Sequence, residues 1–283
     1  MKYAVTAATG KFGQTAVRTL LKLVDPSQVV AVVRNPQKAQ KILPAQVEIR
    51  QGDYTQPAQL EAALAGIERL LFISSLPGGD YPRVQQHLNV VAAAKKAGVN
   101  FVAYTSFPHA DQATSLLSAD HRVTEKALAE SGLTTAFLRN NWYLENQADF
   151  IKTALAGQPV YYATGDRQVG WAPEAIYAQA AAKVLVAAKP KKIYEFAGPM
   201  HTFGELAKAA AEVGGVKADT HAVSKDEYHQ ILQEQGFQAA AEVILMIQDL
   251  IRAGELAHPS EDLEKVLATP LPTLTESIAK VFK

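Results

Sequence analysis

The sequence predicts an α/β fold: a Rossmann-like, doubly wound parallel sheet with a smaller C-terminal α/β lobe. Short apolar runs alternate with segments of helical periodicity through the first half of the chain, and a glycine-rich turn at residues 7–13 follows the first run. The chain has 283 residues, 48% of them hydrophobic, which is enough to bury a large core. Alternating strands and helices imply parallel βαβ units with right-handed crossovers.

Six strands are expected in the first half, at residues 3–6, 29–33, 47–50, 70–73, 101–104 and 134–138. The run at 29–33 is uninterruptedly apolar, as expected for a strand that is buried on both faces. Helices are expected between the strands, at residues 12–23, from Pro36, and at 56–64, 84–97 and 119–130. Gly98 and Gly132 stand where the last two of these helices should end.

The second half is less regular. It predicts helices within 172–188 and at 203–213, 225–233 and 239–251, and a strand at 193–196. We expect residues 1–150 to form the nucleotide-binding core. Residues 151–283 are expected to be a mixed segment that returns to this core and forms the smaller lobe on the substrate side.

The composition excludes several classes of protein. Lys and Arg number 28, as do Asp and Glu, so the basic excess typical of a nucleic-acid binder is missing. No cysteine is present, which excludes disulfides and thiol catalysis. We expect no membrane span, no signal peptide and a cytoplasmic location. We expect no metal site, because His87 and His121 are single histidines without further ligands at metal spacing. A homodimer is one of the assemblies the sequence allows.

The glycine-rich turn is the first candidate binding element. Thr9, Gly10, Lys11, Phe12 and Gly13 lie between the first strand and the first helix, where backbone N–H groups and the helix dipole favour a pyrophosphate. Ala7 stands where such turns usually have their first glycine. If that position needs a positive φ, alanine costs about 1 kcal/mol there. The alternative interpretation is an ordinary strand–helix turn.

Arg34 closes the second strand, at the position beside the adenosine ribose in a dinucleotide fold. An acidic residue there would hold the 2′-hydroxyl of NAD, whereas an arginine suits the 2′-phosphate of NADP. The sequence therefore predicts NADP(H), preferred over NAD(H). The alternative is a solvated cation at a strand end.

Further candidate cofactor residues follow the other strands, because ligands of such sheets bind beyond the carboxyl ends of the strands. They are Asp53 after the third strand, Ser74 and Ser75 after the fourth, and Tyr104 and Thr105 at the fifth. Asp53 is equally well explained as a helix cap or an Asx-turn.

Lys126 lies on the helix after the fifth strand. Conventional short-chain dehydrogenases use Tyr-x-x-x-Lys, but Arg122 occupies the position of the tyrosine here. A tyrosine-driven alcohol dehydrogenase is therefore disfavoured. Lys126 either binds the nicotinamide ribose or forms an exposed i,i+4 pair with Glu130.

Residues 139–146, after the sixth strand, contain Trp142, Tyr143 and three asparagines that include Asn140. Aromatic rings with neutral amides suit a flat ligand that bears carbonyl groups. The alternative is that Trp142 and Tyr143 seal the interface of the smaller lobe.

Several segments together resemble one family. Residues 6–13 are similar to the Thr-Gly-Ala-Thr-Gly-x-x-Gly fingerprint of the NmrA-like atypical short-chain dehydrogenases, and residues 32–36, 51–54, 103–106, 124–126 and 138–146 follow in family order. The whole chain looks most like the bacterial NAD(P)H:quinone oxidoreductase type 2 branch. It departs from the pattern at Ala7, which replaces glycine, and at Asn141, which replaces a small residue.

This resemblance implies an enzyme in which a hydride passes from NADPH to a quinone or a similar small carbonyl acceptor. It implies that Lys126, Asn140 and Tyr143 orient the substrate and the nicotinamide, that Trp142 contributes to the substrate site, and that Phe72 packs against the substrate ring. A non-catalytic NADP(H)-sensing regulator of the NmrA type is the main alternative. Others are a sugar-nucleotide epimerase, a reductase of another enone, and a protein that has lost cofactor binding through Ala7.

Overall fold

In a computed structural model, which describes all 283 residues, seven parallel strands form one sheet in the order β3-β2-β1-β4-β5-β6-β8. The strands are β1 (Tyr3–Val5), β2 (Val29–Val33), β3 (Glu48–Gln51), β4 (Arg69–Phe72), β5 (Phe101–Ser106), β6 (Thr134–Asn140) and β8 (Ile193–Phe196). The six strands expected in the first half are all present, and the strand expected at 193–196 joins the same sheet beside β6. The predicted doubly wound α/β fold is confirmed.

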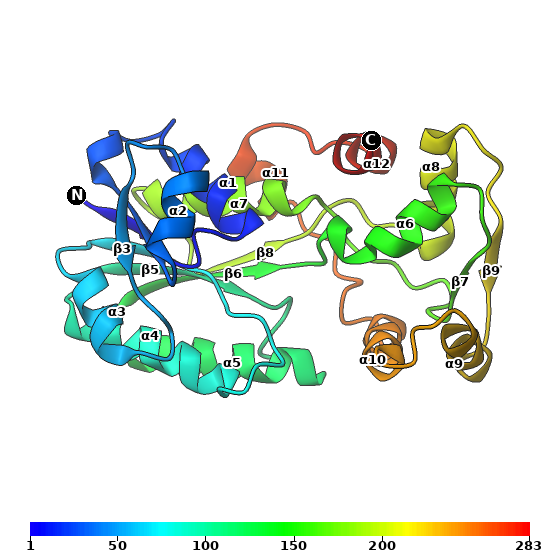
Figure 1. The fold of residues 1–283 in the computed structure, drawn as a ribbon, viewed down its shortest axis with the longest axis horizontal. Helices are drawn as coiled ribbons and strands as arrows, with labels where there is room; N and C mark the ends of the chain where they lie inside the picture. Colours follow the sequence, from blue (N-terminus) through cyan, green and yellow to red (C-terminus); the bar gives the residue numbers. More distant parts are fainter. The chain divides into compact units, whose positions relative to one another are not determined.

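Helices cover both faces of this sheet (Figure 1). On one face α1 (Lys11–Leu20) packs against α7 (Glu174–Val186). The other face carries α3 (Pro57–Leu64), α4 (Arg83–Lys96) and α5 (Leu116–Glu130). The short helix α2 (Pro36–Ile42) connects β2 to β3, and the 3-10 turn η1 (Pro26–Gln28) precedes β2. Parallel strands buried beneath two helical layers explain why β2 is apolar at every position.

The strand order reverses at β1. Val5 of β1 pairs with Ala31 of β2 on one side and with Leu71 of β4 on the other. The chain proceeds outward from β1 to β3 first, and then from β4 to β8 in the opposite direction. In doubly wound sheets the crevice for ligands opens at such a switch point, beyond the carboxyl ends of the strands. Here the switch point lies between the segments that follow β1 and β4.

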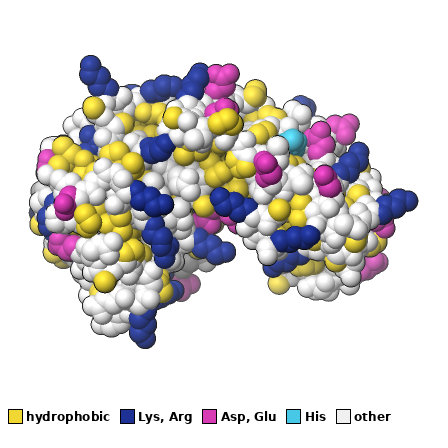
Figure 2. Space-filling view, turned by 90° about the horizontal axis from the view of Figure 1, so that it is seen from above, with side chains coloured by type: hydrophobic (Ala, Val, Ile, Leu, Met, Phe, Trp, Pro, Cys, Tyr) yellow, Lys and Arg dark blue, Asp and Glu magenta, His cyan; other side chains and the backbone are white.

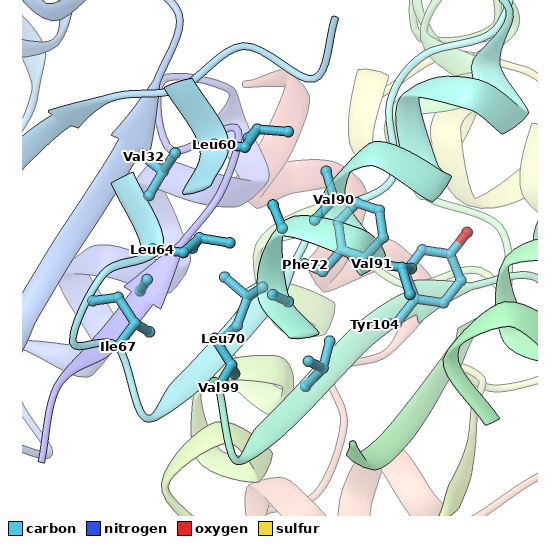
Figure 3. Packing of buried hydrophobic residues seen from close by; sticks show 14 of the residues in the cluster. Val32, Leu60, Leu64, Ile67, Leu70, Phe72, Val90, Val91, Val99 and Tyr104 are labelled. Carbon is cyan, nitrogen blue, oxygen red and sulfur yellow. The ribbon is translucent and has the colours of Figure 1, made fainter. Parts of the chain in front are cut away.

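The main core fills the space between the sheet and α3, α4 and α5. Figure 3 shows the rings of Phe72 and Tyr104 beside Val90 and Val91 of α4. The Phe72 and Tyr104 ring centroids are 4.9 Å apart, and both side chains are fully buried. These two strand residues therefore belong to the core.

The chain divides into two compact units. The first comprises residues 1–140, 174–196 and 265–268, and the second comprises 141–173, 197–264 and 269–283. The first stretch of the first unit thus ends with β6, and α7 and β8 bring the chain back to it. The short helix α11 (Asp262–Leu267) leads into the last piece of the first unit.

The second unit has its own small sheet, in which β7 (Val160–Tyr162) and β9 (Thr220–Ala222) are parallel. Its helices are α6 (Ala148–Leu155), α8 (Phe203–Gly214), α9 (Lys225–Glu234), α10 (Ala241–Arg252) and α12 (Leu274–Phe282), with the 3-10 turn η2 (Leu144–Gln147) before α6. The sequence predicted α8, α9 and α10, but not β7, β9, α6, α11 or α12. Phe203 is the centre of an aromatic cluster with Phe150, Tyr162 and Trp171.

Basic, acidic and apolar side chains all appear on the face shown in Figure 2, in keeping with a formal net charge of zero. None of the helices combines the length and the apolar character needed to span a bilayer.

Candidate functional site

The turn between β1 and α1 is a tight, strained loop. Ala7 adopts φ +48°, in the left-handed region, and its carbonyl oxygen accepts a hydrogen bond from the Gly10 N–H at 3.0 Å. Gly13 packs so closely beneath this turn that a Cβ atom there would lie 2.5 Å from the Ala7 oxygen. Gly13 is therefore required for the helix to approach the turn. The sequence analysis considered a positive φ at position 7 as one possibility. The structure shows that Ala7 does adopt it.

The amino end of α1 is suited to an anion. Gly10 is the N-cap, no side chain caps the helix, and no acidic residue lies in its first turn. Lys11, at the first helical position, is exposed, whereas Phe12 is buried and anchors the helix. The Thr9 carbonyl accepts a hydrogen bond from Gln14 Nε2 at 3.0 Å. The helix dipole and the Lys11 charge both favour a phosphate group at this turn.

Arg34 follows β2 directly, at the same edge of the sheet. Its side chain is exposed, and its guanidinium forms no ion pair or hydrogen bond within the protein. Only its carbonyl oxygen is engaged, by Gln51 Nε2 at 3.4 Å. The next residue, Asn35, caps α2 by accepting a hydrogen bond from the Lys38 N–H at 2.9 Å. Arg34 thus provides a cation on a fixed backbone, next to the β1–α1 turn.

Asp53 forms an Asx-turn after β3. Its carboxylate accepts hydrogen bonds from the backbone N–H and the hydroxyl group of Thr55, both at 2.9 Å. The structure thus shows the Asx-turn, whereas the N-cap of α3 is Gln56. The adjacent Tyr54, which sequence reasoning missed, places its hydroxyl oxygen 2.5 Å from Thr6 Oγ1 and 2.6 Å from the Ile73 carbonyl oxygen. Tyr54 therefore ties together the segments that leave β1 and β4. Burial raises its pKa above the usual range.

The three residues beyond β4 leave the sheet, yet their backbone N–H groups all remain hydrogen-bonded. The Ile73 N–H donates to Thr6 Oγ1 at 3.0 Å, the Ser74 N–H to Thr105 Oγ1 at 2.8 Å and the Ser75 N–H to His87 Nε2 at 3.1 Å. The acceptors come from the end of β1, from β5 and from α4. Side-chain acceptors thus take the place of the backbone carbonyls that a neighbouring strand would offer, and they fix the chain at the switch point. Ser74, Ser75 and Thr105 therefore lie together beyond the carboxyl ends of β4 and β5.

Phe72 and Tyr104 do not join this group. Both side chains are fully buried on the α4 side of the sheet, so neither can contact a ligand at the strand ends. The expectations that Phe72 packs against the substrate and that Tyr104 binds the cofactor are corrected. In a strand buried on both faces, the sequence pattern does not show toward which face a residue points.

Beneath the switch point lies a buried polar cluster that the sequence did not reveal. The Tyr104 hydroxyl lies 2.9 Å from His121 Nδ1 and 3.4 Å from His87 Nδ1. Arg83 Nη2 lies 3.1 Å from His121 Nε2. Burial, with the nearby Arg83 charge, lowers the pKa of His87 to about 3 and holds that of His121 well below its usual range, where His87 also contributes. Both imidazoles are therefore neutral near pH 7.

Lys126 forms no hydrogen bond or ion pair with the other predicted residues. Its side chain is 75% exposed, and its ammonium group lies 3.9 Å from Glu130. The side chains that α5 buries are those of Ser118, His121, Thr124, Glu125 and Leu128. The structure therefore shows the exposed i,i+4 pair that was the alternative interpretation of Lys126.

At the end of β6, Arg139 is buried among carboxylates. It binds Glu125 through two hydrogen bonds, Nε to Oε1 at 2.9 Å and Nη2 to Oε2 at 2.7 Å. Its Nη1 atom lies 2.9 Å from Glu195 Oε1 and 2.6 Å from Asp111 Oδ1. This cluster fixes the carboxyl end of β6, where the next residue, Asn140, is buried and lies at the same edge of the sheet as Thr105.

The remaining candidates, Trp142 and Tyr143, belong to the second unit. Asn141 holds this segment: its amide nitrogen donates to the Leu256 carbonyl at 3.0 Å, and its side-chain oxygen accepts from the Trp142 N–H at 2.8 Å. Tyr143 forms a β-bridge with Ala172. Both aromatic side chains are partly exposed, and the buried indole Nε1 of Trp142 has no hydrogen-bond acceptor in the protein.

Comparisons with known proteins agree with this geometry. A family described as NAD(P)H-binding matches residues 7–188. Quinone oxidoreductase 2 of Escherichia coli (strain K12) is 39% identical over 99% of this chain and 98% of its own length. The structure of an NADPH-dependent quinone oxidoreductase from Escherichia coli complexed with NADPH superposes with a TM-score of 0.92, at 38% identity, over 99% of this chain and 100% of that chain. Citrobacter sp. triphenylmethane reductase complexed with NADP(H) does so with a TM-score of 0.91, at 33% identity, over 99% of both chains.

Proposed function

The chain belongs to the NAD(P)H-binding family, and on that premise we propose that it is an NADPH-dependent oxidoreductase that transfers a hydride to a quinone or a similar small carbonyl acceptor. The observation that carries the proposal is the pairing of two features at one edge of the sheet. The uncapped amino end of α1 lies at the β1–β4 switch point, and the unpaired guanidinium of Arg34 follows the adjacent strand.

Preference for NADPH over NADH rests on Arg34. A free guanidinium beside the adenosine ribose has a partner only if the ribose carries a 2′-phosphate. No carboxylate follows β2 to accept the 2′-hydroxyl of NAD, since Arg34 and Asn35 occupy that place. Thr9, Gly10, Lys11, Phe12 and Gly13 would hold the pyrophosphate. Ser74, Ser75 and Thr105 would lie toward the nicotinamide ribose.

A quinone as acceptor fits the absence of a catalytic tyrosine. Bound NADPH supplies the hydride. Reduction of a ketone leaves an alkoxide, whereas reduction of a quinone leaves a phenolate-like anion. With a phenol pKa of about 10 against roughly 16 for water, the phenolate is easier to form by about 8 kcal/mol. Positioning and a few hydrogen bonds can then suffice, without a strong proton donor in the protein.

For the substrate we propose Asn140, Trp142 and Tyr143. Asn140 offers a neutral amide at the end of β6, and the two aromatic side chains follow it directly in the chain. Flat aromatic surfaces and neutral hydrogen-bonding groups suit a planar acceptor. Phe72 and Tyr104 are left out of the proposed site because their side chains are buried in the core, and Lys126 is left out because its ammonium group pairs with Glu130.

Two measurements test this function. NADPH oxidation should be stimulated by benzoquinone and menadione; NADPH binding without turnover above the blank would instead support the NADP(H)-sensing regulator. Arg34→Ala should raise the Kd for NADPH about 10- to 100-fold, the loss expected for charge-assisted hydrogen bonds, and leave the Kd for NADH nearly unchanged. Lys22→Ala, which removes an exposed cation beyond the carboxyl end of α1, is the matched control. Equal losses of NADPH and NADH affinity in Arg34→Ala would refute the role of Arg34.

A further inference from the structure

We propose that His87 is a positioning residue that fixes the chain after β4 along the nicotinamide side of the cofactor site, an inference that rests on the proposed function. His87 lies on α4, inside the protein, and is itself fully buried. It acts on the site through the backbone of Ser75.

Ser75 is held from two sides by α4. Its N–H donates to His87 Nε2 at 3.1 Å, and its carbonyl oxygen accepts a hydrogen bond from Arg83 Nε at 2.6 Å. Arg83 and His87 are four residues apart and so share one face of the helix. The two preceding N–H groups are bound by Thr6 and Thr105. His87 is thus the last of three side chains that accept hydrogen bonds from the backbone N–H groups of residues 73–75, where the chain continues beyond β4.

The hydrogen bonds fix the protonation state of His87. Nε2 faces the Ser75 N–H and must be an acceptor, so the ring proton lies on Nδ1. Nδ1 lies 2.8 Å from Thr124 Oγ1, and the Thr124 hydroxyl donates onward to the Asp120 carbonyl at 2.7 Å. Each group in this series of hydrogen bonds, from the Ser75 N–H to the Asp120 carbonyl, thus has a consistent role as donor or acceptor.

The surroundings keep the imidazole in that state. The ionisable groups that face it are Arg83 on its own helix, Tyr104 on β5 and His121 on α5. The two carboxylates near this cluster are engaged elsewhere: that of Asp120 lies 3.5 Å from Arg83, and that of Glu125 binds Arg139. No anion compensates a proton on His87. The low pKa of His87, caused by burial and by Arg83, agrees with this arrangement.

A purely structural role would need only the bulk of the ring. His87 does pack edge-on against Phe72, with the ring centroids 5.4 Å apart. The two roles make different demands on a substituted side chain, however. Bulk can be supplied by many residues, whereas an acceptor at the position of Nε2 can be supplied by few.

Two variants of His87 separate the roles. The side-chain amide of glutamine can reach the position of Nε2, whereas that of asparagine reaches only as far as Nδ1. H87Q can therefore keep the bond to Ser75, and H87N can keep only the bond to Thr124. Both remove the ring from the core, so both should lower the melting temperature. We expect the Kd for NADPH to rise about tenfold in H87N and to stay within about threefold of wild type in H87Q.

Hydrogen exchange of the backbone amides of residues 73–75 in the cofactor-free protein gives a readout that does not depend on nucleotide or quinone. Exchange should accelerate in H87N and remain slow in H87Q. The positioning role is overturned if H87N and H87Q lose NADPH affinity and protection from exchange to the same extent. It is also overturned if both variants have a lower melting temperature but neither loses affinity or protection. It is also overturned if the wild type binds no nucleotide. If the wild type binds NADPH but turns over no quinone, only the proposed reaction fails, and the contrast between the variants still decides the role of His87.

Discussion

Ala7→Gly should stabilise the protein. Ala7 bears φ +48° in the β1–α1 turn, a conformation in which its Cβ is crowded against the backbone. Its methyl group is exposed, so its removal leaves no cavity. Glycine adopts this conformation without the steric penalty. The substitution therefore isolates backbone strain from packing.

The size of the effect follows from two opposing terms. Relief of the left-handed conformation contributes about 1–2 kcal/mol, and the greater freedom of glycine in the unfolded chain subtracts about 0.5–1 kcal/mol. The expected net gain is about 0.5–1 kcal/mol, or roughly 1–4 °C in melting temperature for a chain of this size. Affinity for NADPH should be preserved or improved, because the turn keeps its shape.

Thermal unfolding of three variants would test this reasoning. Ala8→Gly removes a fully buried methyl group next to the turn and should destabilise by about 1–2 kcal/mol. Ala268→Gly relieves another exposed alanine, at φ +57° in a different loop, and should stabilise without any effect on NADPH. A lower melting temperature for Ala7→Gly than for wild type would refute the strain argument. A marked loss of NADPH affinity would mean that the methyl group itself contributes to binding.

Two further predictions concern buried charge. Below pH 6.5 the unfolded chain protonates His87 and His121, whereas both stay neutral in the folded state. The free energy of unfolding should therefore fall as the pH is lowered below 6.5, by about 2.7 kcal/mol per pH unit for the two histidines together. Urea unfolding between pH 6 and 4.5 measures this slope, which should be about half as large in H87Q. Arg139→Ala, which leaves the Glu125 carboxylate buried without its cation, should lower the free energy of unfolding by about 3–5 kcal/mol in the same assay, and a loss below about 1 kcal/mol would contradict the pairing.

The sequence predicted the strands and helices of the first unit because their signals are local. An apolar run such as 29–33 and a helix that ends at Gly98 need no knowledge of distant residues. The order of the strands was not predicted, since doubly wound sheets have more than one common order, of which 3-2-1-4-5-6 is the one observed here. In the second unit β7 and β9 have only three residues each, too few for a periodic pattern to be distinguished from a loop.

Side-chain partners were beyond the reach of the sequence. Thr6, Thr105 and His87 converge on residues 73–75 only because β1, β5 and α4 are neighbours in space. Likewise, a one-residue difference in position on α5 separates the buried Glu125 from the exposed Lys126. The boundaries of a helix do not fix which of its residues face the sheet.

The anchoring of residues 73–75 from outside has a practical consequence for engineering. The backbone path depends on hydrogen-bond acceptors borne by other elements. Substitutions at 74 and 75 would therefore remove only the side-chain contacts of Ser74 with Thr105 and of Ser75 with His87, and leave the backbone hydrogen bonds in place. A library at these two positions, with Thr6, Thr105 and His87 kept constant, would therefore vary the nicotinamide side of the proposed cofactor site on an unchanged backbone.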